Sequence, residues 1–381
     1  MSKHSYATYQ SSIITKPKRG AGRILGRIFG TLLFLIVFGA VCLLAFLTLT
    51  EYQPAASEQL EIGGKTLRTL STDEEMTILT WNIGYGGLSD QTDFIMDGGK
   101  DVIGSSEERV KQNMKDIIAE AQGLEPDIAL FQEVDIDSWR SYGINEARML
   151  TNSLPNTNSA FAYNYKTAFV PIGIPPYGKI ESGIQTISSF PINSAVRSSL
   201  PQSDGWPLST VFLKRAQLIT RIPVEGSRHE LVIINEHPDA YVSEEIHRKQ
   251  MDAIIETLQK EASKGNWVIA GGDWNHHFSS IDVSNYPLLR EDSWQPGHID
   301  VKEFGEGWQF VMDNTTPTNR LLDAPISDEA GNPTREVFQG YMIDGFIVSS
   351  NVRVESVETR NLRFKASDHN PVVIKVLLEK D

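Results

Sequence analysis

An uncharged segment near the N-terminus most constrains what this chain can become. Residues 28–50, IFGTLLFLIVFGAVCLLAFLTLT, carry no charged side chain across 23 positions. At about 1.5 Å of helical rise per residue, this segment is longer than the roughly 30 Å hydrocarbon core of a bilayer. A cleaved secretory signal is the alternative, but its apolar region runs for only about 7–15 residues. The segment therefore predicts a retained transmembrane helix.

The charges beside the apolar segment indicate which way it would cross a membrane. Glu51 follows the segment, and six basic side chains precede it: Lys3, Lys16, Lys18, Arg19, Arg23 and Arg27. Because basic residues concentrate on the cytoplasmic side of membrane spans, we expect residues 1–27 to form a basic cytoplasmic tail. The protein would then be a single-pass protein of the cell membrane. Its large remaining part would lie outside the cell, attached to the lipid bilayer by this helix.

Composition narrows the function classes for that outer part. The formal net charge is -14, and basic residues are concentrated before the apolar segment, so the remainder is more acidic than the total. An acidic body argues against tight nonspecific binding of nucleic acid, whose phosphates are held by lysine and arginine. The only cysteine, Cys42, lies in the apolar segment. An intramolecular disulfide and a cysteine-based zinc site are therefore excluded.

Beyond the apolar segment, the sequence indicates a linker and one folded domain. Residues 51–75 are polar, contain proline and glycine, and show no clear period, so we expect a linker there. Residues 76–381 contain many short β-rich runs and no internal repeat. Two stretches, 105–122 and 244–262, place apolar residues at helical spacing. Many strands with few helices predict two stacked mixed β-sheets with helices on their outer faces.

Polar side chains stand at the ends of six apolar runs in this domain. They are Asn82; Glu133; Asn235 with His237; Asp273 with Asn275; Asp344; and Asp368 with His369. Each residue alone is typical of a turn or of a solvated surface. Together they combine hard carboxylate oxygens, which suit Mg²⁺ or Mn²⁺, with a pair of histidines, which suit proton transfer. The six segments therefore predict one shared site.

These motifs resemble those of the endonuclease/exonuclease/phosphatase superfamily, which includes deoxyribonucleases, abasic-site endonucleases, inositol-phosphate phosphatases and neutral sphingomyelinases. The matching stretches are WN at 81–82, LFQEV at 130–134, SGIQTISSFPI at 182–192, Arg215, NEHPDA at 235–240, GGDWN at 271–275, IDGFIVS at 343–349 and SDHNPV at 367–372. The resemblance implies a four-layered α/β sandwich that hydrolyses phosphate esters with a divalent metal ion.

The resemblance also implies which residues bind metal and substrate. Glu133 would be the principal ligand of Mg²⁺, with Mn²⁺ as the alternative, and Asn82 and Asp368 would help to hold the ion. Asn235 and Arg215 would contact the substrate phosphate.

The implied catalytic residues are Asp273, Asn275, His369, Asp344 and His237. Asp273 would orient or deprotonate the attacking water, and the Asn275 amide would hold a phosphoryl oxygen. His369 would contact a phosphoryl oxygen or transfer a proton, oriented by Asp344. His237 lies where the hydrolytic nuclease and sphingomyelinase branches place their second histidine.

Some features depart from the family pattern. Glu236 and Pro238 flank the central histidine, where the family often has a small residue and leucine. His276 and His277 are additional. A second metal site could use them, but adjacent side chains point in different directions on most backbones, so we favour a solvated loop.

Two long loops are expected near the site. Residues 87–104 exceed the usual length of a connection between a strand and a helix, which is about 2–6 residues. We expect this loop, with Phe94, Met96 and Lys100, to overhang the site and shape the substrate pocket. Residues 292–332, which include TPTNR at 316–320, form a second loop-rich segment that could contact substrate.

Taken together, the sequence predicts a membrane-anchored, Mg²⁺-dependent phosphodiesterase, in which water attacks a phosphodiester of a phospholipid-like or other small molecule. An extracellular endonuclease or exonuclease is the alternative, favoured by the paired histidines. However, no run of basic and aromatic residues supports binding of single strands. A catalytically inactive scaffold domain is a weaker alternative, because Glu133, Asp273 and His369 are all present.

Overall fold

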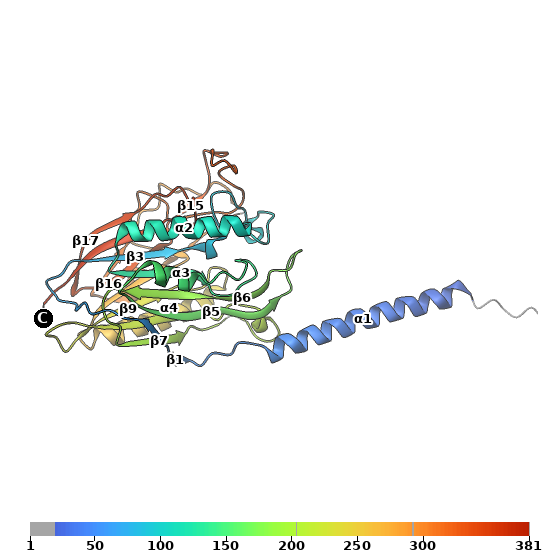
Figure 1. The fold of residues 1–381 in the computed structure, drawn as a ribbon, viewed down its shortest axis with the longest axis horizontal. Coiled ribbons are helices and arrows are strands. Elements are labelled where there is room, and N and C mark those ends of the chain that lie inside the picture. Colours follow the sequence, from blue (N-terminus) through green and yellow to red (C-terminus); the bar gives the residue numbers. More distant parts are fainter. Residues whose placement is uncertain (1–19, 203, 292, 381) are drawn as a thin grey trace, which may run out of the picture. The chain divides into compact units, whose positions relative to one another are not determined.

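The computed structural model describes residues 20–202, 204–291 and 293–380 (Figure 1). The chain divides into two compact units, one ending at Leu49 and the other beginning at Thr50. Most of the predicted basic tail, residues 1–19, lies outside the described residues.

The first unit contains helix α1, which spans Ala21–Leu49. Within the described part of the chain, it is the one helix long and apolar enough to cross a membrane, by its length and composition. A signal sequence near the N-terminus would meet the same criterion. The helix begins seven residues before the predicted span, so Arg23 and Arg27 lie on its first turns.

The second unit contains two seven-stranded sheets. In the first, the strand order is β1-β7-β8-β9-β10-β16-β13. These strands are β1 (Ser57–Gln59), β7 (Ser194–Ser199), β8 (Ala216–Pro223), β9 (Glu230–Glu236), β10 (Trp267–Asp273), β16 (Asp344–Ser349) and β13 (Trp308–Val311). Only β9 and β10 are parallel neighbours.

In the second sheet the order is β17-β18-β3-β4-β6-β5-β2. The strands are β17 (Val352–Thr359), β18 (Val372–Leu378), β3 (Met76–Asn82), β4 (Ile128–Asp135), β6 (Gly178–Ser188), β5 (Asn158–Val170) and β2 (Ile62–Gly64). The central strands β3 and β4 run parallel, and the other pairs are antiparallel. Two further short pairs, β11 (His276–Phe278) with β12 (Gly297–Ile299) and β14 (Asn319–Arg320) with β15 (Gly340–Tyr341), lie outside both sheets.

Apolar side chains on both faces of the central strands explain the layers. Ile78 and Leu130 from one sheet and Ile233 and Ile269 from the other belong to a single core between the sheets. The alternate residues point outward and are covered by helices. Helices α2 (Glu107–Leu124) and α3 (Glu146–Ser153) pack on the second sheet, and α4 (Glu244–Ala262) packs on the first. Because both faces are buried, these strands appear in the sequence as continuous apolar runs. The predicted four-layered α/β sandwich is confirmed (Figure 1).

The segment expected to be a polar linker, residues 51–75, instead contributes an edge strand to each sheet. β1 pairs with β7, and β2 pairs with β5. Leu60 and Ile62 pack against the core between the sheets. Each strand has only three residues, which is too short for an alternating pattern to stand out in the sequence.

Two glycines near the end of β10 leave room for neighbouring groups. A Cβ atom at Gly272 would lie 2.0 Å from the carbonyl oxygen of Glu236, on the neighbouring strand β9. A Cβ atom at Gly271 would lie 2.5 Å from the Phe346 ring. The backbone of β9 cannot retreat without breaking its pairing, so Gly272 is fixed by this close approach.

We therefore expect Gly272→Ala to destabilise the domain by about 1–3 kcal/mol, as overpacking does in a close-packed interior. Gly123→Ala in α2 is the matched control, because no atom lies within 4 Å of the added Cβ. That control should be neutral or stabilising by up to about 1 kcal/mol, since alanine favours helix. Thermal unfolding of the detergent-solubilised chain measures both, and equal midpoints for the two variants would contradict the packing argument.

Candidate active site

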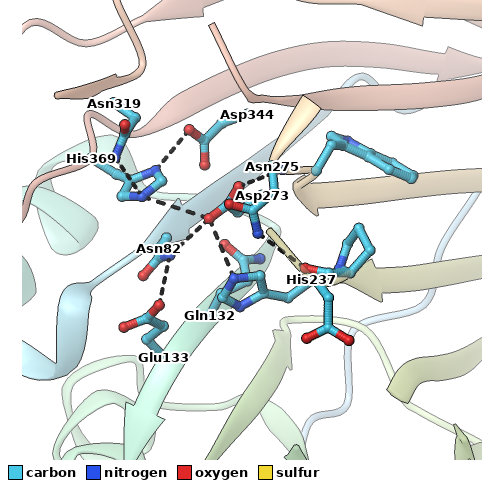
Figure 2. Close-up of polar contacts among 12 residues, drawn as sticks. Asn82, Gln132, Glu133, His237, Asp273, Asn275, Asn319, Asp344 and His369 are labelled. Atoms are coloured by element: carbon cyan, nitrogen blue, oxygen red, sulfur yellow. Dashed lines mark hydrogen bonds and ion pairs between the residues drawn. The ribbon is translucent and has the colours of Figure 1, made fainter. Parts of the chain in front are cut away.

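The polar residues predicted from the sequence meet at one edge of the sandwich. Asn82 ends β3 and Asp273 ends β10, and residues of these two strands contact across the sheets. Asp344 begins β16 and lies opposite Asp273 in the antiparallel register. His369 precedes β18, which runs antiparallel to β3. The strand directions therefore bring residues from both sheets together (Figure 2).

A local irregularity in β4 places Glu133. The register between β4 and β6 shifts between Phe131 and Val134. Glu133 has a φ of 53°, in the left-handed region that non-glycine residues rarely adopt. Such bulges redirect a side chain at the edge of a sheet. The Glu133 carboxylate consequently lies beside Asn82, with 3.4 Å between Oε1 and Nδ2 (Figure 2).

The carboxylate of Asp273 lies at the centre of the site. Its Oδ2 atom accepts a hydrogen bond of 3.0 Å from Asn82 Nδ2. The same oxygen lies 3.4 Å from His237 Nε2 and 3.6 Å from His369 Nε2. Its other oxygen, Oδ1, accepts the backbone N–H of Asn275 at 2.9 Å. Asp273 is therefore held in one orientation with a histidine on either side (Figure 2).

His369 is paired with Asp344. Its Nδ1 atom lies 2.8 Å from Asp344 Oδ2, and both residues are buried. Burial alone would lower the pKa of His369, but the carboxylates of Asp344 and Asp273 raise it well above its usual value. The predicted orientation of this histidine by Asp344 agrees with the geometry.

The residue that sequence reasoning missed is Asn319. Its Nδ2 atom lies 2.9 Å from His369 Nε2 and 3.3 Å from the carbonyl oxygen of Asp368. With the amide placed this way, Nε2 accepts from Asn319 when the imidazole is neutral, whereas the acceptor that the described residues offer to a protonated Nε2 is Asp273 Oδ2, at 3.6 Å. Asn319 belongs to the TPTNR stretch, which the sequence marked only as part of a loop-rich segment. No pattern of spacing singled it out.

The second histidine, His237, is held in a different charge state. Burial and the positive charges of Arg215 and His369 lower its pKa well below the usual value. Its Nδ1 atom has no hydrogen-bond partner among the described residues. The site therefore contains one histidine that favours the protonated form and one that favours the neutral form. Two like groups pushed apart in this way are suited to opposite roles in acid–base chemistry.

The chemistry of Glu133 and Asp368 fits a divalent cation. Burial, together with the negative charge of Glu133, raises the pKa of Asp368 to about 7. The negative charges of Glu133 and Asp368 therefore repel each other, and a cation would relieve this repulsion. Oxygen donors are the ligands that Mg²⁺ and Mn²⁺ prefer. Asp273, Asp344 and His369 also lie close enough to offer ligand atoms to a metal ion. However, His369 Nδ1 lies 2.8 Å from Asp344 Oδ2, so these two residues are already bonded to each other, and Glu133 and Asp368 remain the predicted ligands.

The amide oxygen of Asn82, predicted to help hold the metal ion, accepts a backbone hydrogen bond, and its role as a ligand stays a prediction. Its Oδ1 atom accepts the backbone N–H of Gly84 at 3.0 Å, and its Nδ2 atom faces Asp273 and Glu133. The amide therefore presents hydrogen atoms to these carboxylates. Asn82 supports the site by orienting two acids.

Two other predicted substrate contacts are engaged within the fold. Asn235, expected to bind phosphate, is fully buried. Its Nδ2 atom donates to the carbonyl oxygens of Phe131 and Gln185, and its Oδ1 atom accepts from Gln132. That prediction is wrong, because the amide joins the two sheets. Asn275 has a φ of 54° and donates from Nδ2 to Pro238 O at 3.0 Å, so its amide also fixes a turn.

The remaining predicted contact, Arg215, lies near His237 but is tied to an acid. Its Nε atom donates to Asp239 Oδ1 at 3.0 Å, and the guanidinium is buried. Its charge still reaches the site, since it lowers the pKa of His237.

The two additional histidines do not lie in the solvated loop that we expected. His276 and His277 form β11, which pairs with β12, and both are half-buried. The His276 ring stacks on His247 of α4, with 3.7 Å between ring centroids. Short strands outside the main sheets leave no sequence period, which is why the pairing was not foreseen.

The loop at 87–104 lies beside the acids of the site, as predicted. Its short helical turn, Ile95–Asp97, brings the Asp97 carboxylate within 2.8 Å of the Tyr241 hydroxyl, which donates to it. The charge of Asp97 contributes to the raised pKa of Asp368. Met96 in this turn is exposed. The predicted role of the whole loop in shaping the substrate pocket stays a prediction.

Glu236 is a buried acid that directly precedes His237 in the sequence. Gln217 Nε2 donates to its Oε1 atom at 2.6 Å, whereas Oε2 has no partner among the described residues. Burial raises the pKa of Glu236 to about 8. The acid is therefore held in its neutral form in the folded domain at neutral pH.

The pKa of Glu236 in the folded domain lies above its ordinary value of 4.5. Glu236 therefore contributes to the free energy of unfolding in full below about pH 4.5, and this contribution is lost as the pH rises through about 8. We expect Glu236→Gln to reduce the fall in unfolding free energy between about pH 5 and about pH 9. Glu225→Gln, at an exposed position, should leave the slope unchanged. Chemical denaturation across this range makes the comparison, and parallel curves for wild type and Glu236→Gln would contradict it.

Comparisons with known proteins concern the fold and the family of the chain. Among solved structures, the fold is similar to an endonuclease/exonuclease/phosphatase from Beutenbergia cavernae, at 17% identity and a TM-score of 0.50, covering 80% of this chain and 72% of that one. A Bacteroides vulgatus endonuclease/exonuclease/phosphatase gives 15% identity, a TM-score of 0.49, and coverage of 80% and 100%. The human Nocturnin catalytic domain with bound sulfate is 15% identical, with a TM-score of 0.48, and the match covers 84% of this chain and 97% of that one. At these identities the likeness concerns the fold alone.

No curated protein sequence matches the chain significantly. The family model described as the Endonuclease/Exonuclease/phosphatase family matches residues 79–369, which include every residue assembled above from Asn82 to His369. Since that match covers well over half of the chain, the chain belongs to the endonuclease/exonuclease/phosphatase family.

Proposed function

We propose that this protein is a membrane-anchored, Mg²⁺-dependent phosphoesterase that hydrolyses phosphodiester bonds, with phospholipid-like molecules as its substrates and water as the nucleophile. The observation that carries the proposal is the position of the Asp273 carboxylate. It lies between a histidine that favours the proton and one that does not, beside the acids Glu133 and Asp368.

The chain's own residues can divide the reaction between them. Asp273, oriented by Asn82 and by the Asn275 backbone, takes a proton from water as the water oxygen bonds to phosphorus. As the ester P–O bond breaks, His369 gives its Nε2 proton to the leaving oxygen, and Asp344 stabilises the imidazolium beforehand. Each such acid or base typically accelerates a reaction by about 10²–10⁴-fold.

A divalent cation held by Glu133 and Asp368, Mg²⁺ or alternatively Mn²⁺, would neutralise the charge that develops on the phosphoryl oxygens. The neutral His237 adds no charge near the phosphate, and it limits the movement of Asp273 from the opposite side.

The activity test compares the full chain with Asp273→Asn and His369→Gln on phospholipid vesicles, plasmid DNA and a soluble bis-aryl phosphodiester. We expect Mg²⁺-dependent hydrolysis of the lipid and of the soluble ester, reduced about 10²–10⁴-fold in both variants. Asn319→Ala should lower kcat by about two- to tenfold, because one neutral hydrogen bond is lost, with KM nearly unchanged. Exposed Asp252→Asn and His298→Gln are the matched controls, with expected activity equal to wild type.

Each other outcome of this assay has a meaning. Cleavage of DNA in preference to lipid would favour the alternative of an extracellular nuclease. A folded protein without activity on any of the three substrates would support an inactive scaffold.

We further propose that α1 crosses the cell membrane with the N-terminus in the cytoplasm and the catalytic domain outside. Its length and the preceding basic residues support this orientation. The mass of the protein extracted from membranes is the check. We expect a chain that retains residues 28–50, and a mature N-terminus beyond Leu49 would instead indicate a cleaved signal sequence.

A further inference from the structure

Two uncharged loops expose apolar side chains on the second unit. We call them the rim loops: residues 170–178, VPIGIPPYG, and residues 205–213, GWPLSTVFL. In the first loop, Ile174 is 99% exposed and Ile172 is 51% exposed. In the second, Trp206 is 61% exposed and Leu208 is 52% exposed. Large apolar side chains grouped on a surface, without charge between them, indicate an interaction site.

The rim loops are held next to each other by strand β5. The Tyr165 hydroxyl donates to the carbonyl oxygen of Val211 at 3.0 Å. The Thr167 hydroxyl donates to Thr210 O at 3.1 Å. Because β5 leads directly into the first loop, these bonds join the second loop to its base. The exposed side chains are therefore presented by one supported surface.

This surface borders the site. Glu133 lies on β4, and the loop that follows this strand is bonded to the start of β6. Ile136 N donates to Glu181 O at 2.8 Å, and Trp139 N donates to Lys179 O at 2.9 Å. The first rim loop ends at that same place. In Figure 1 the turn between β5 and β6 lies at the end of the strands opposite to the C-terminus.

A cationic side chain connects the first rim loop with the loop that follows Asn82. Arg140 Nη1 donates to the Tyr177 hydroxyl at 2.7 Å. The Arg140 guanidinium also lies 3.7 Å from the centroid of the Tyr85 ring. Tyr85 belongs to the turn directly after β3. The rim loops therefore have a fixed position relative to the catalytic groups.

The chain joins the domain at this same surface. Glu51 Oε1 lies 3.2 Å from Lys214 Nζ, and Lys214 directly follows the second rim loop. Both side chains are largely buried. Glu51 is only two residues beyond Leu49, where α1 ends. Two residues span at most about 7 Å, so the end of α1 cannot lie far from Glu51 whatever direction the helix takes.

We propose that the rim loops insert into the surface of a phospholipid bilayer and hold the active site against the lipid headgroups. The proposal rests on the membrane anchor and the lipid substrate proposed above. A membrane-spanning α1 brings Glu51, and with it the rim loops, to the bilayer surface. Tryptophan favours the membrane interface, burial of isoleucine and leucine is favourable, and the absence of charge removes the main cost of insertion.

The first experiment measures where the loops lie, without any need for activity. Cys42 is the only cysteine, so Cys42→Ser allows a single nitroxide label at Ile174→Cys or at Leu67→Cys in the full chain. Leu67 is a matched apolar control, since it is 86% exposed. It lies at the opposite end of the strands, where Thr66 donates to Ser189 O, beyond the end of β6. Both proteins are reconstituted in vesicles of phosphatidylcholine and phosphatidylglycerol.

We expect the label at position 174 to be relaxed by lipid-soluble oxygen and shielded from a water-soluble nickel chelate, with the reverse at position 67. Equal exposure to water at both positions would overturn the proposal. Shielding at 174 from both reagents, increasing with protein density, would indicate a second copy of this chain or another protein as the occupant and would also overturn it.

The second experiment measures the effect on hydrolysis. Ile174→Ser combined with Leu208→Ser should reduce hydrolysis of vesicle phospholipid on the order of tenfold, because the burial of two apolar side chains is lost. Hydrolysis of the soluble bis-aryl ester should not change, and Leu67→Ser should affect neither substrate. An equal loss on both substrates would mean a damaged site and contradict the proposal. If the wild-type protein hydrolyses neither substrate, the proposed function fails, while the label positions still decide whether the loops insert.

Discussion

The junction between the two sheets fixes the geometry on which the site depends. Asn235, from one sheet, bonds to two carbonyl groups and to the Gln132 side chain of the other. Gln132 in turn donates to Thr80 on β3. These bonds form only when the two sheets are aligned as they are here, and losing them in a buried site would be costly. Asn82 and Glu133 lie on one sheet, and Asp273 and His237 lie on or directly after strands of the other. The alignment of the sheets therefore sets the distance between these two pairs of residues.

Electrostatics then gives similar residues different tasks. His237 and His369 both face one oxygen of Asp273, yet the cation Arg215 lies near the first and the carboxylate of Asp344 holds the second. Their pKa values therefore move in opposite directions. Neither histidine could be assigned its protonation state from sequence, because the neighbours that decide it come from distant strands.

The sequence predicted two stacked sheets from its many short β-rich runs and few helices, and the resemblance to the family implied the four-layered sandwich. The sequence also predicted that Glu133, Asp273, Asp344 and His369 share one site, because each lies at the end of an apolar run. What it could not foretell depends on hydrogen-bond partners: which atom Asn82 presents, and that Asn235 joins the sheets. Asn319 was missed because it reaches His369 from a two-residue strand that leaves no period.

The pairing of β3 with β18 has a consequence for the timing of activity. β3, at residues 76–82, lies between β4 and β18, and β18 spans residues 372–378. The sheet that carries Asn82 and Glu133 is therefore incomplete until a segment almost three hundred residues later has been synthesised, and contacts so distant in sequence form slowly. Asp368 and His369 reach the site only with that strand. A chain still emerging from the ribosome therefore lacks two of the residues that we propose to act on phosphate esters.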